Sequence, residues 1–375
     1  MRIVSFFIVV CMAFCYSCID PFEIAFTESD AQLVVDGLIT DAPGPYTIKI
    51  YKTKPVGDQI SNPVWVEKAK VWILDDTGAQ EQLAEIKPGH YATSILGIQG
   101  QIGKTYTLRI QVGEAIFESS PETMTPVGEI RNLSYTFKQV EDPQTTDYIN
   151  VKNGFEVFVD AEAIPGQRMR WRTMGTFEII SYPERKTKLE GGSGGSVVVI
   201  PDPPKCSGWT YSKTLGLREV GACTCCDCWI TTFDEVPLLA DQTFAQNGEI
   251  KGLKVAFIGA SKRHFYKKFY FQLEQMSVSE SVYKFWETVR DQKESGSDLF
   301  QTPPGKTVGN IHAVNSNERV IGVFAVSAIK HAHMTFTPDQ IPYFMPYIDE
   351  VEESCLLIYN GTASKSSTNA KPPFW

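Results

Sequence analysis

Short stretches of alternating apolar and polar residues, separated by turns, constrain the fold of this chain more than any other feature. Residues 46–51 alternate in this way, and residues 106–110 repeat the pattern. A period of two puts the apolar side chains on one face of a half-buried β-strand. Residues 41–45 and 75–78 are turn sequences rich in Asp, Pro and Gly. With no helical pattern between the strands, residues 32–125 are predicted to form a β-sandwich of immunoglobulin or transthyretin type.

A second, larger β domain is predicted over residues 126–375. Residues 155–159 and 269–273 alternate like the strands of the first domain. One amphipathic helix interrupts them, because Ser277 and Glu280 have the spacing of a capping box. The apolar stripe that follows has helical spacing and is expected to pack on the sheet: Val282, Phe285, Trp286 and Val289.

Six cysteines follow residue 18: Cys206, Cys223, Cys225, Cys226, Cys228 and Cys355. All but Cys355 lie in a long insertion, residues 183–231. In an exported chain, an even number favours disulfides, with bound metal and redox activity as alternatives. If all six are paired and Cys206 does not bond Cys355, each of these two bonds into the cluster at 223–228, and the remaining two bond each other. The neighbours Cys225 and Cys226 are expected to take different partners.

Aromatic residues flank the cysteines. Trp209, Tyr211 and Trp229 are candidates for binding a glycan or a peptide, since aromatic side chains on fixed loops give contact area at little entropic cost. Burial under the same loops is the alternative.

One predicted strand carries arginines at every second position: Arg168, Arg170 and Arg172. Side chains two residues apart share one face of a strand. This face is either a solvated surface or an anion-binding stripe.

The sequence contains no complete catalytic or metal-binding motif. Residues 191–195 match the Gly-x-Ser-x-Gly pattern, but β-branched residues and a proline follow Ser193, so the helix that the motif requires cannot form. His331 and His333 share a strand face without a third ligand. We therefore expect no metal, no cofactor and no identifiable catalytic residue. A carboxylate-based hydrolase stays an alternative, because 44 acidic residues offer many pairs.

The amino-terminal residues indicate export. Arg2 precedes an apolar run over residues 3–14, which is too short to span a hydrocarbon core of about 30 Å. Ser17 before Cys18 suits cleavage and lipid attachment, so residues 1–17 are predicted to be a lipoprotein signal peptide and residues 18–31 a lipidated tether. Stable anchoring by acyl chains needs more than one chain. An ordinary signal peptide with an incidental cysteine is the alternative.

The charge of the chain excludes one class of partner. The net charge is −9 at pH 7, whereas nucleic-acid binding needs a basic surface. After the signal, no stretch of 18 apolar residues follows that could span a membrane.

Several segments together resemble a Bacteroidetes lipoprotein family known as domain of unknown function four-two-four-nine. These segments are residues 18–23, 33–41, 226–229, 283–286, 303–311, 320–328 and 371–375. The resemblance implies an outer-membrane lipoprotein, often encoded beside a TonB-dependent receptor, with no established activity. Relatives often have a second cysteine near the position of Cys355. Its absence here favours a bond between Cys355 and the cysteine cluster.

These observations lead to one functional expectation with two alternatives. We expect a non-enzymatic lipoprotein of the outer membrane, on its periplasmic or surface face, that assists a TonB-dependent receptor and binds a glycan or peptide. The alternatives are a hydrolase of the cell envelope and a structural or adhesive surface protein.

Overall fold

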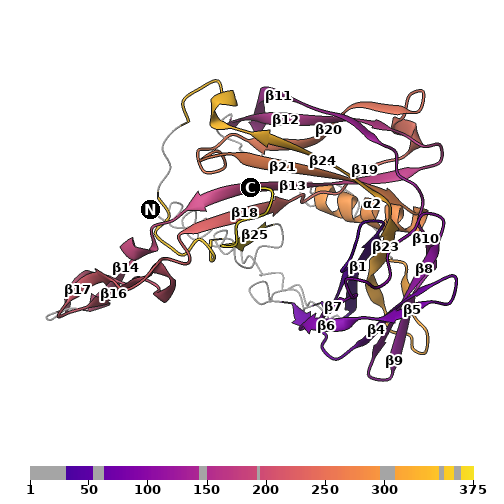
Figure 1. Ribbon diagram of the computed structural model, residues 1–375, viewed down its shortest axis with the longest axis horizontal. Helices are drawn as coiled ribbons and strands as arrows, with labels where there is room; N and C mark the ends of the chain where they lie inside the picture. Colours follow the sequence, from indigo (N-terminus) through magenta and orange to yellow (C-terminus); the bar gives the residue numbers. More distant parts are fainter. Residues whose placement is uncertain are drawn as a thin grey trace, which may run out of the picture.

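The computed structural model describes residues 31–53, 63–142, 150–191, 195–295, 309–345, 350–358 and 365–375. These residues fold mainly into β-strands (Figure 1), with one α-helix among them. The prediction of a mainly β protein is therefore confirmed. The predicted signal peptide, Cys18 and all of the tether except Ala31 lie outside the described residues.

Six strands form a first sheet, sheet A: β1 (Leu33–Thr40), β2 (Thr47–Lys52), β3 (Val64–Trp65), β6 (Ala84–Lys87), β7 (His90–Ala92) and β23 (Val320–Ser327). Their order is β23-β1-β2-β7-β6, with β3 beside β2. On β2, Ile48 and Ile50 are fully buried and Lys49 between them is exposed. The alternation in the sequence is thus the alternation between core and solvent.

Six further strands form sheet B: β4 (Lys70–Asp75), β5 (Gln80–Gln82), β8 (Thr105–Val112), β9 (Ala115–Ser119), β10 (Glu122–Thr123) and β22 (Ile311–Ala313). Their order is β22-β9-β8-β4-β5, with β10 beside β8. Val35 and Ile48 from sheet A belong to the same hydrophobic core as Ile73 and Leu108 from sheet B. The two sheets therefore share one core, which we call the first core.

Two strands of the first core come from late in the chain. β23 runs parallel to β1 over its whole length, from Leu33 opposite Val320 to Thr40 opposite Ser327. At Gly322 a side chain would meet the Val35 carbonyl oxygen at 1.9 Å, so only glycine permits this close approach. The sequence pattern predicts one separate domain over residues 126–375, whereas β22 and β23 from that range belong to the sheets of the first core.

Sheets C and D enclose a second core. Sheet C has the order β11-β12-β20, with strands β11 (Ile130–Asp142), β12 (Asn150–Glu162) and β20 (Glu249–Gly259). The strands of sheet D are β13 (Arg168–Ile180), β18 (Asp227–Phe233), β19 (Leu238–Ala240), β21 (Phe269–Val278), β24 (Ile329–Phe336) and β25 (Lys365–Thr368). Their order is β24-β21-β13-β18-β25, with β19 beside β13. Phe155 from sheet C and Trp171 and Phe271 from sheet D are among the side chains that fill this core.

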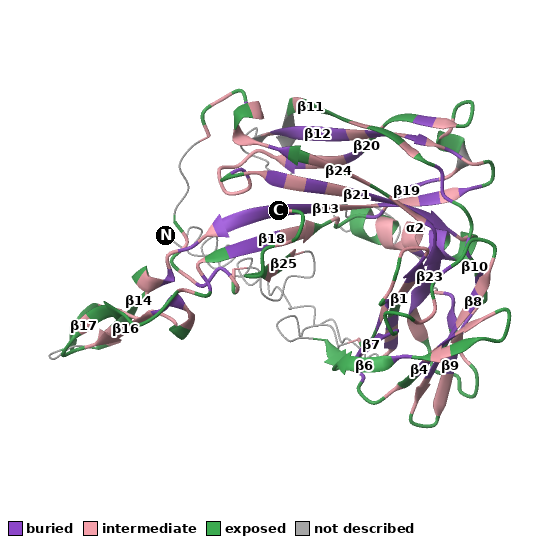
Figure 2. Ribbon diagram, in the orientation of Figure 1, coloured by how far each residue is buried: buried purple, intermediate pink, exposed green. Residues whose placement is uncertain are grey.

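The helix α2 (Glu280–Ser295) connects the two units. Its residues Val282 and Phe285 pack with Leu239 of β19 and with Val323 and Ala325 of β23. The predicted helix and its buried stripe are confirmed. Figure 2 shows its exposed outer side and the buried strands beside it.

The predicted capping residue of α2 was wrong. The Ser279 hydroxyl, not that of Ser277, accepts a hydrogen bond from the Val282 amide at 3.3 Å. Ser277 still lies in β21, where its hydroxyl donates to the Thr125 carbonyl at 2.7 Å and accepts from the Ala328 amide at 3.0 Å. The strand pairing of Ser277 therefore overrides its local helix-capping preference.

Two hairpins project from sheet D between β13 and β18 (Figure 1). They consist of β14 (Thr187–Gly191) with β15 (Val197–Pro201), and β16 (Trp209–Ser212) with β17 (Gly216–Glu219). We call residues 183–226, apart from 192–194, which lie outside the described residues, the arm. Short 3-10 helices complete the fold: η1 (Pro183–Arg185), η3 (Lys205–Ser207), η4 (Gln242–Phe244) and η5 (Pro338–Gln340). Within the described parts of the chain, no helix is long and apolar enough to cross a membrane.

Candidate functional site

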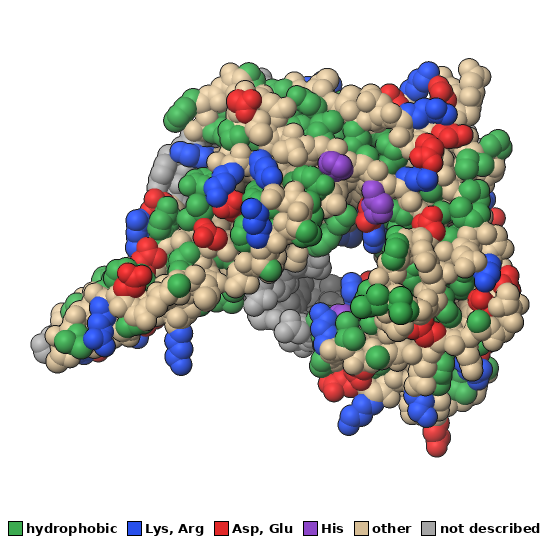
Figure 3. Space-filling view, viewed as in Figure 1, with side chains coloured by type: hydrophobic (Ala, Val, Ile, Leu, Met, Phe, Trp, Pro, Cys, Tyr) green, Lys and Arg blue, Asp and Glu red, His purple; other side chains and the backbone are tan. Residues whose placement is uncertain are grey.

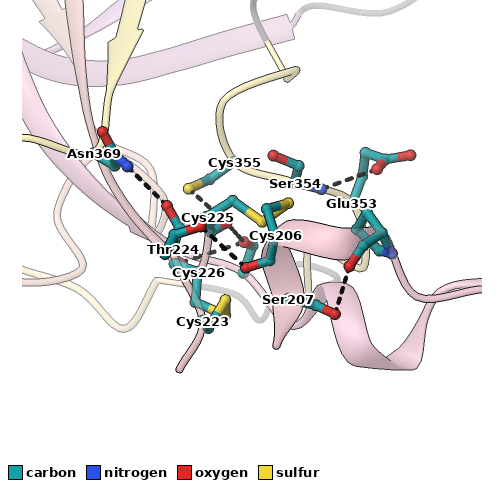
Figure 4. Close-up of a disulfide and its surroundings, with 12 residues drawn as sticks. Cys206, Ser207, Cys223, Thr224, Cys225, Cys226, Glu353, Ser354, Cys355 and Asn369 are labelled. Carbon is teal, nitrogen blue, oxygen red and sulfur yellow. Dashed lines mark hydrogen bonds between the residues drawn. A yellow bond between two sulfur atoms is a disulfide. The ribbon is translucent and has the colours of Figure 1, made fainter. Parts of the chain in front are cut away.

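Three disulfides lie at the base of the arm or directly beside it, and Figure 4 labels Cys206, Cys223, Cys225, Cys226 and Cys355 there. They are Cys206–Cys225, Cys223–Cys226 and Cys228–Cys355. The predicted disulfide framework is confirmed: all six cysteines are paired, and Cys225 and Cys226 take different partners. The bond from Cys228 on β18 reaches 127 residues along the chain and ties residues 350–358 to β18, directly after the arm.

Backbone hydrogen bonds reinforce the same base. The Ser181 amide donates to the Cys226 carbonyl at 2.7 Å, and its hydroxyl donates to the Cys225 carbonyl at 3.0 Å. The Tyr182 amide donates to the Val351 carbonyl at 2.7 Å. Covalent and hydrogen bonds together fix the arm where it leaves sheet D.

Ion pairs add to this base and tie the hairpins together. Arg185 pairs with Glu350, and Lys186 pairs with Glu353. Farther along the arm, Lys213 Nζ lies 2.7 Å from Glu190 Oε1 and joins the second hairpin to the first.

The arm exposes aliphatic side chains to solvent. Leu189 on β14 lies opposite Val199 on β15, and these side chains are 72% and 61% exposed. The other exposed aliphatic residues of the arm are Val197, Val198, Leu215, Leu217 and Val220. Figure 3 shows hydrophobic side chains along the arm. A two-stranded ribbon is at best marginally stable alone in water, and an extended exposed apolar surface marks an interaction site.

The predicted ligand-binding aromatics do not form one cluster. Trp209 and Tyr211 are half-buried on β16 of the arm, where they pair with Glu219 and Leu217. Trp229 is buried on β18, beside Thr368 of the edge strand β25. Burial therefore accounts for Trp229, whereas Trp209 and Tyr211 remain partly accessible on the arm.

A second surface lies on the outer face of sheet D, where the rings of three residues stack. The Tyr270 ring on β21 lies 5.6 Å from the His333 ring and 4.5 Å from the Phe374 ring, with interplanar angles of 27° and 18°. His333 is exposed and Phe374 is 39% exposed. Phe374 therefore covers one face of Tyr270 without being buried itself.

The tail, residues 371–375, is shaped by its own sequence. The Trp375 amide donates to the Pro372 carbonyl at 3.0 Å and closes a turn, with Pro373 at the position that favours proline. This turn presents Phe374 to Tyr270 and places the Trp375 indole beside Glu178 of β13. The end of the chain lies over sheet D in Figure 1.

Glu178 is a buried carboxylate that receives two donors. Its Oε1 accepts from Lys267 Nζ at 2.5 Å, and its Oε2 accepts from Trp375 Nε1 at 3.2 Å. With the tail in place, only 5% of Glu178 is exposed. Lys268 Nζ lies 4.5 Å from the centre of the Trp375 ring.

The contacts of the tail are close in free energy to the cost of ordering it. The ring stack, the cation–π contact and the hydrogen bond to a charged acceptor together contribute about 4 kcal/mol. Ordering five backbone positions costs about 5 kcal/mol at 1 kcal/mol each, and the two prolines lower that cost because their φ is already fixed. The polar and ring contacts of the tail and the cost of ordering its backbone are therefore of similar size.

The arginine stripe is explained by ion pairs within the chain. The pairs are Arg168 with Glu280 at 3.3 Å, Arg170 with Asp234 at 3.9 Å, and Arg172 with Glu274 at 2.7 Å. Arg170 also stacks on Trp286 of α2, with 3.6 Å from its guanidinium carbon to the ring centre. Burial lowers the pKa of Arg170 to about 10 and raises the pKa of Asp234. The stripe is thus neither a solvated face nor an open anion site, because helix α2 covers Arg170 and carboxylates face all three side chains.

The described residues hold no group of three or more His, Cys, Asp or Glu side chains placed to bind a metal ion. His331 Nδ1 lies 3.8 Å from Glu274 Oε1, and His333 stacks on Tyr270. The buried Glu156 faces Lys138 at 2.9 Å and Lys254 at 3.3 Å. The hydrogen bond from Lys138 lowers the pKa of Glu156, which is opposite to what a general acid needs.

Ser193 lies outside the described residues. The residues after it form β15 rather than a helix. The strand-to-helix turn of a nucleophile elbow is therefore not formed there.

A family comparison covers most of the chain. The model of a domain of unknown function, DUF4249, matches residues 19–332. The chain belongs to this family. The resemblance seen in the sequence segments is thereby confirmed at the level of the family. No curated protein matches this DUF4249 chain. The matched region ends within β24, so Cys355 and the tail of the DUF4249 protein lie beyond it.

Sequence reasoning missed the two surfaces described above. The run from Val197 to Ile200 is β-branched and apolar, which is a signal for a strand, but its exposure depends on the hairpin having only two strands. The rings of Tyr270 and Phe374 meet across more than one hundred residues, and no spacing rule connects them.

Proposed function

We propose that this DUF4249 protein is an outer-membrane lipoprotein, anchored through Cys18, that binds a membrane partner and catalyses no reaction. The exposed aliphatic surface of the disulfide-held arm is the observation that carries this proposal. The partner that fits best is a TonB-dependent receptor in the same membrane, as the family resemblance implies.

The chemistry of the arm supports a protein partner. Lys188 pairs with Asp202, and Lys213 pairs with Glu190, so these charges are matched within the arm. The aliphatic side chains, in contrast, have no apolar cover from the part of the chain that the structure describes. Because disulfides already fix the base of the arm, less entropy is lost when the arm binds than for a flexible loop.

Co-purification from detergent-solubilised membranes tests the proposal. The arm variant replaces three exposed residues on one face of the first hairpin, Leu189→Ser, Val197→Ser and Val199→Ser. Losing about 1 kcal/mol from each buried contact weakens binding about 100-fold. We expect the receptor to elute with the unchanged protein and to be lost from the arm variant.

A matched control makes the same chemical change elsewhere. Ile86, Ile95 and Leu96 are 60%, 75% and 96% exposed in the N-terminal unit. Their replacement by serine should leave the receptor in the eluate. A monomer without a receptor, from the unchanged protein, would contradict the proposal, and so would an arm variant that retains its partner.

A further inference from the structure

The outer face of sheet D has the geometry of a small binding site that the protein fills with its own tail. Phe374 lies against one face of Tyr270 with ring centres 4.5 Å apart. The adjacent buried Glu178 accepts the indole N–H of Trp375 at 3.2 Å. Lys268 lies over the same indole. The ring of Tyr270, the carboxylate of Glu178 and the ammonium group of Lys268 therefore all contact the tail at neighbouring positions.

We propose that this slot, formed by Tyr270, Glu178 and Lys268, is a peptide-binding site for an aromatic residue that follows proline. The tail is its resident occupant, and a partner segment of the same chemistry displaces it. The site is separate from the arm, so the proposal is independent of receptor binding through the arm.

Two observations argue against a purely structural role for the tail. A side chain that only packed this segment onto the sheet would be expected in a core, whereas Phe374 remains 39% exposed. Glu178 is 5% exposed, and one of its oxygens accepts a donor that only the tail supplies among the described residues. A buried acceptor that depends on the tail for a donor is suited to exchange between occupants.

The contacts that the tail makes in the slot favour a peptide over a glycan as the ligand. Two prolines fix the tail in its turn, so an incoming segment with proline in the same place loses little conformational entropy on binding. A glycan could stack on Tyr270, but the indole N–H and the cation–π contact belong to an aromatic side chain.

The test uses a fluorescent peptide Lys-Pro-Pro-Phe-Trp and the protein shortened after Ala370. Fluorescence anisotropy should show saturable binding to the shortened protein and at least tenfold weaker binding to the full chain. Tyr270→Ala in the shortened protein, or Lys-Pro-Pro-Ala-Trp as the peptide, should weaken binding at least tenfold. Phe244→Ala is the matched control, because Phe244 is an exposed aromatic residue of η4 (53% exposed) and not of sheet D.

A second variant covers the case in which the shortened protein does not fold. Phe374→Ala in the full chain opens the slot and should increase peptide affinity several-fold over the unchanged protein. Several outcomes would overturn the proposal: no saturable binding to either variant, binding that is insensitive to Tyr270→Ala, or preference for an oligosaccharide over the peptide. Dimers of the full chain formed by tail exchange would assign the slot to a second copy and would also overturn it.

Discussion

His264 is a partly buried histidine, and its surroundings favour the neutral form. Its ring lies 4.6 Å from the Phe177 ring, and its Nδ1 lies 3.1 Å from the Gly259 carbonyl oxygen, to which it donates in the neutral form. Burial is the main cause that lowers the pKa of His264 below its usual value of 6.5. The unfolded chain therefore binds a proton at a higher pH than the folded protein does.

The consequence is a loss of stability in mild acid. As the pH falls below 6.5, the unfolded state gains a proton on this residue first, so the free energy of unfolding decreases until the pH reaches the lowered folded pKa. His264→Phe keeps an aromatic ring against Phe177 and should flatten the dependence of the urea midpoint on pH between 7.5 and about 5.5.

The exposed His312 provides the comparison. His312→Gln should keep the slope of the unchanged protein. An identical slope in His264→Phe and the unchanged protein would show that His264 does not carry this acid sensitivity.

At the scale of elements, two serines near the junction of β21 and α2 make different kinds of hydrogen bond. Ser279 accepts one hydrogen bond from the first turn of the helix, whereas Ser277 makes two buried hydrogen bonds between β21, the segment before β11 and the start of β24. Losing a cap costs about 1 kcal/mol. Leaving a buried amide such as that of Ala328 without an acceptor adds about 1–3 kcal/mol.

We therefore predict that Ser277→Ala destabilises the protein more than Ser279→Ala. Urea unfolding followed by tryptophan fluorescence should give losses of about 3 kcal/mol and about 1 kcal/mol, respectively. The reverse order would mean that the cap, and not the link between the strands, limits stability here.

At the scale of the whole molecule, the disulfides differ in the length of chain that they close. Cys228–Cys355 spans 127 residues, and Cys223–Cys226 spans 3. In the chain-entropy model, the long loop contributes about 5 kcal/mol and the short loop about 1.5 kcal/mol.

Paired alanine variants should show this difference. Replacing Cys228 and Cys355 together should lower the urea midpoint about three times as much as replacing Cys223 and Cys226, under non-reducing conditions. Equal losses would indicate that strain or packing, rather than loop closure, determines what each bond contributes.

Local features of the fold were predictable from the sequence, and long-range pairings were not. The strand of Ile48 and the buried stripe of α2 follow from periodicity, which depends only on neighbouring residues. Counting the cysteines predicted that Cys206 and Cys355 each bond into the cluster, but it did not say which partner each takes. The pairing of β1 with β23 could not be read, because any two apolar strands satisfy the same pattern.

The candidate sites show the same division. The sequence predicted a binding site in the cysteine region, with Trp209 and Tyr211 as candidates. The arm carries an exposed aliphatic surface in that region. It gave no sign that Tyr270, Glu178 and Phe374 meet, since each comes from a different part of the chain. Such a site exists only once sheet D has formed.

Because β23 pairs with β1, the first core can form only after β23 has been synthesised. Synthesis runs from the amino terminus, so β1 is made long before residues 320–327 are available to pair with it. Until then, β1 presents an unpaired edge, and contacts between distant residues form slowly. The first core therefore closes only after residues 320–327 have been made. A nascent or truncated chain that ends before Val320 would keep this edge open, which makes it a substrate for chaperones and a seed for aggregation.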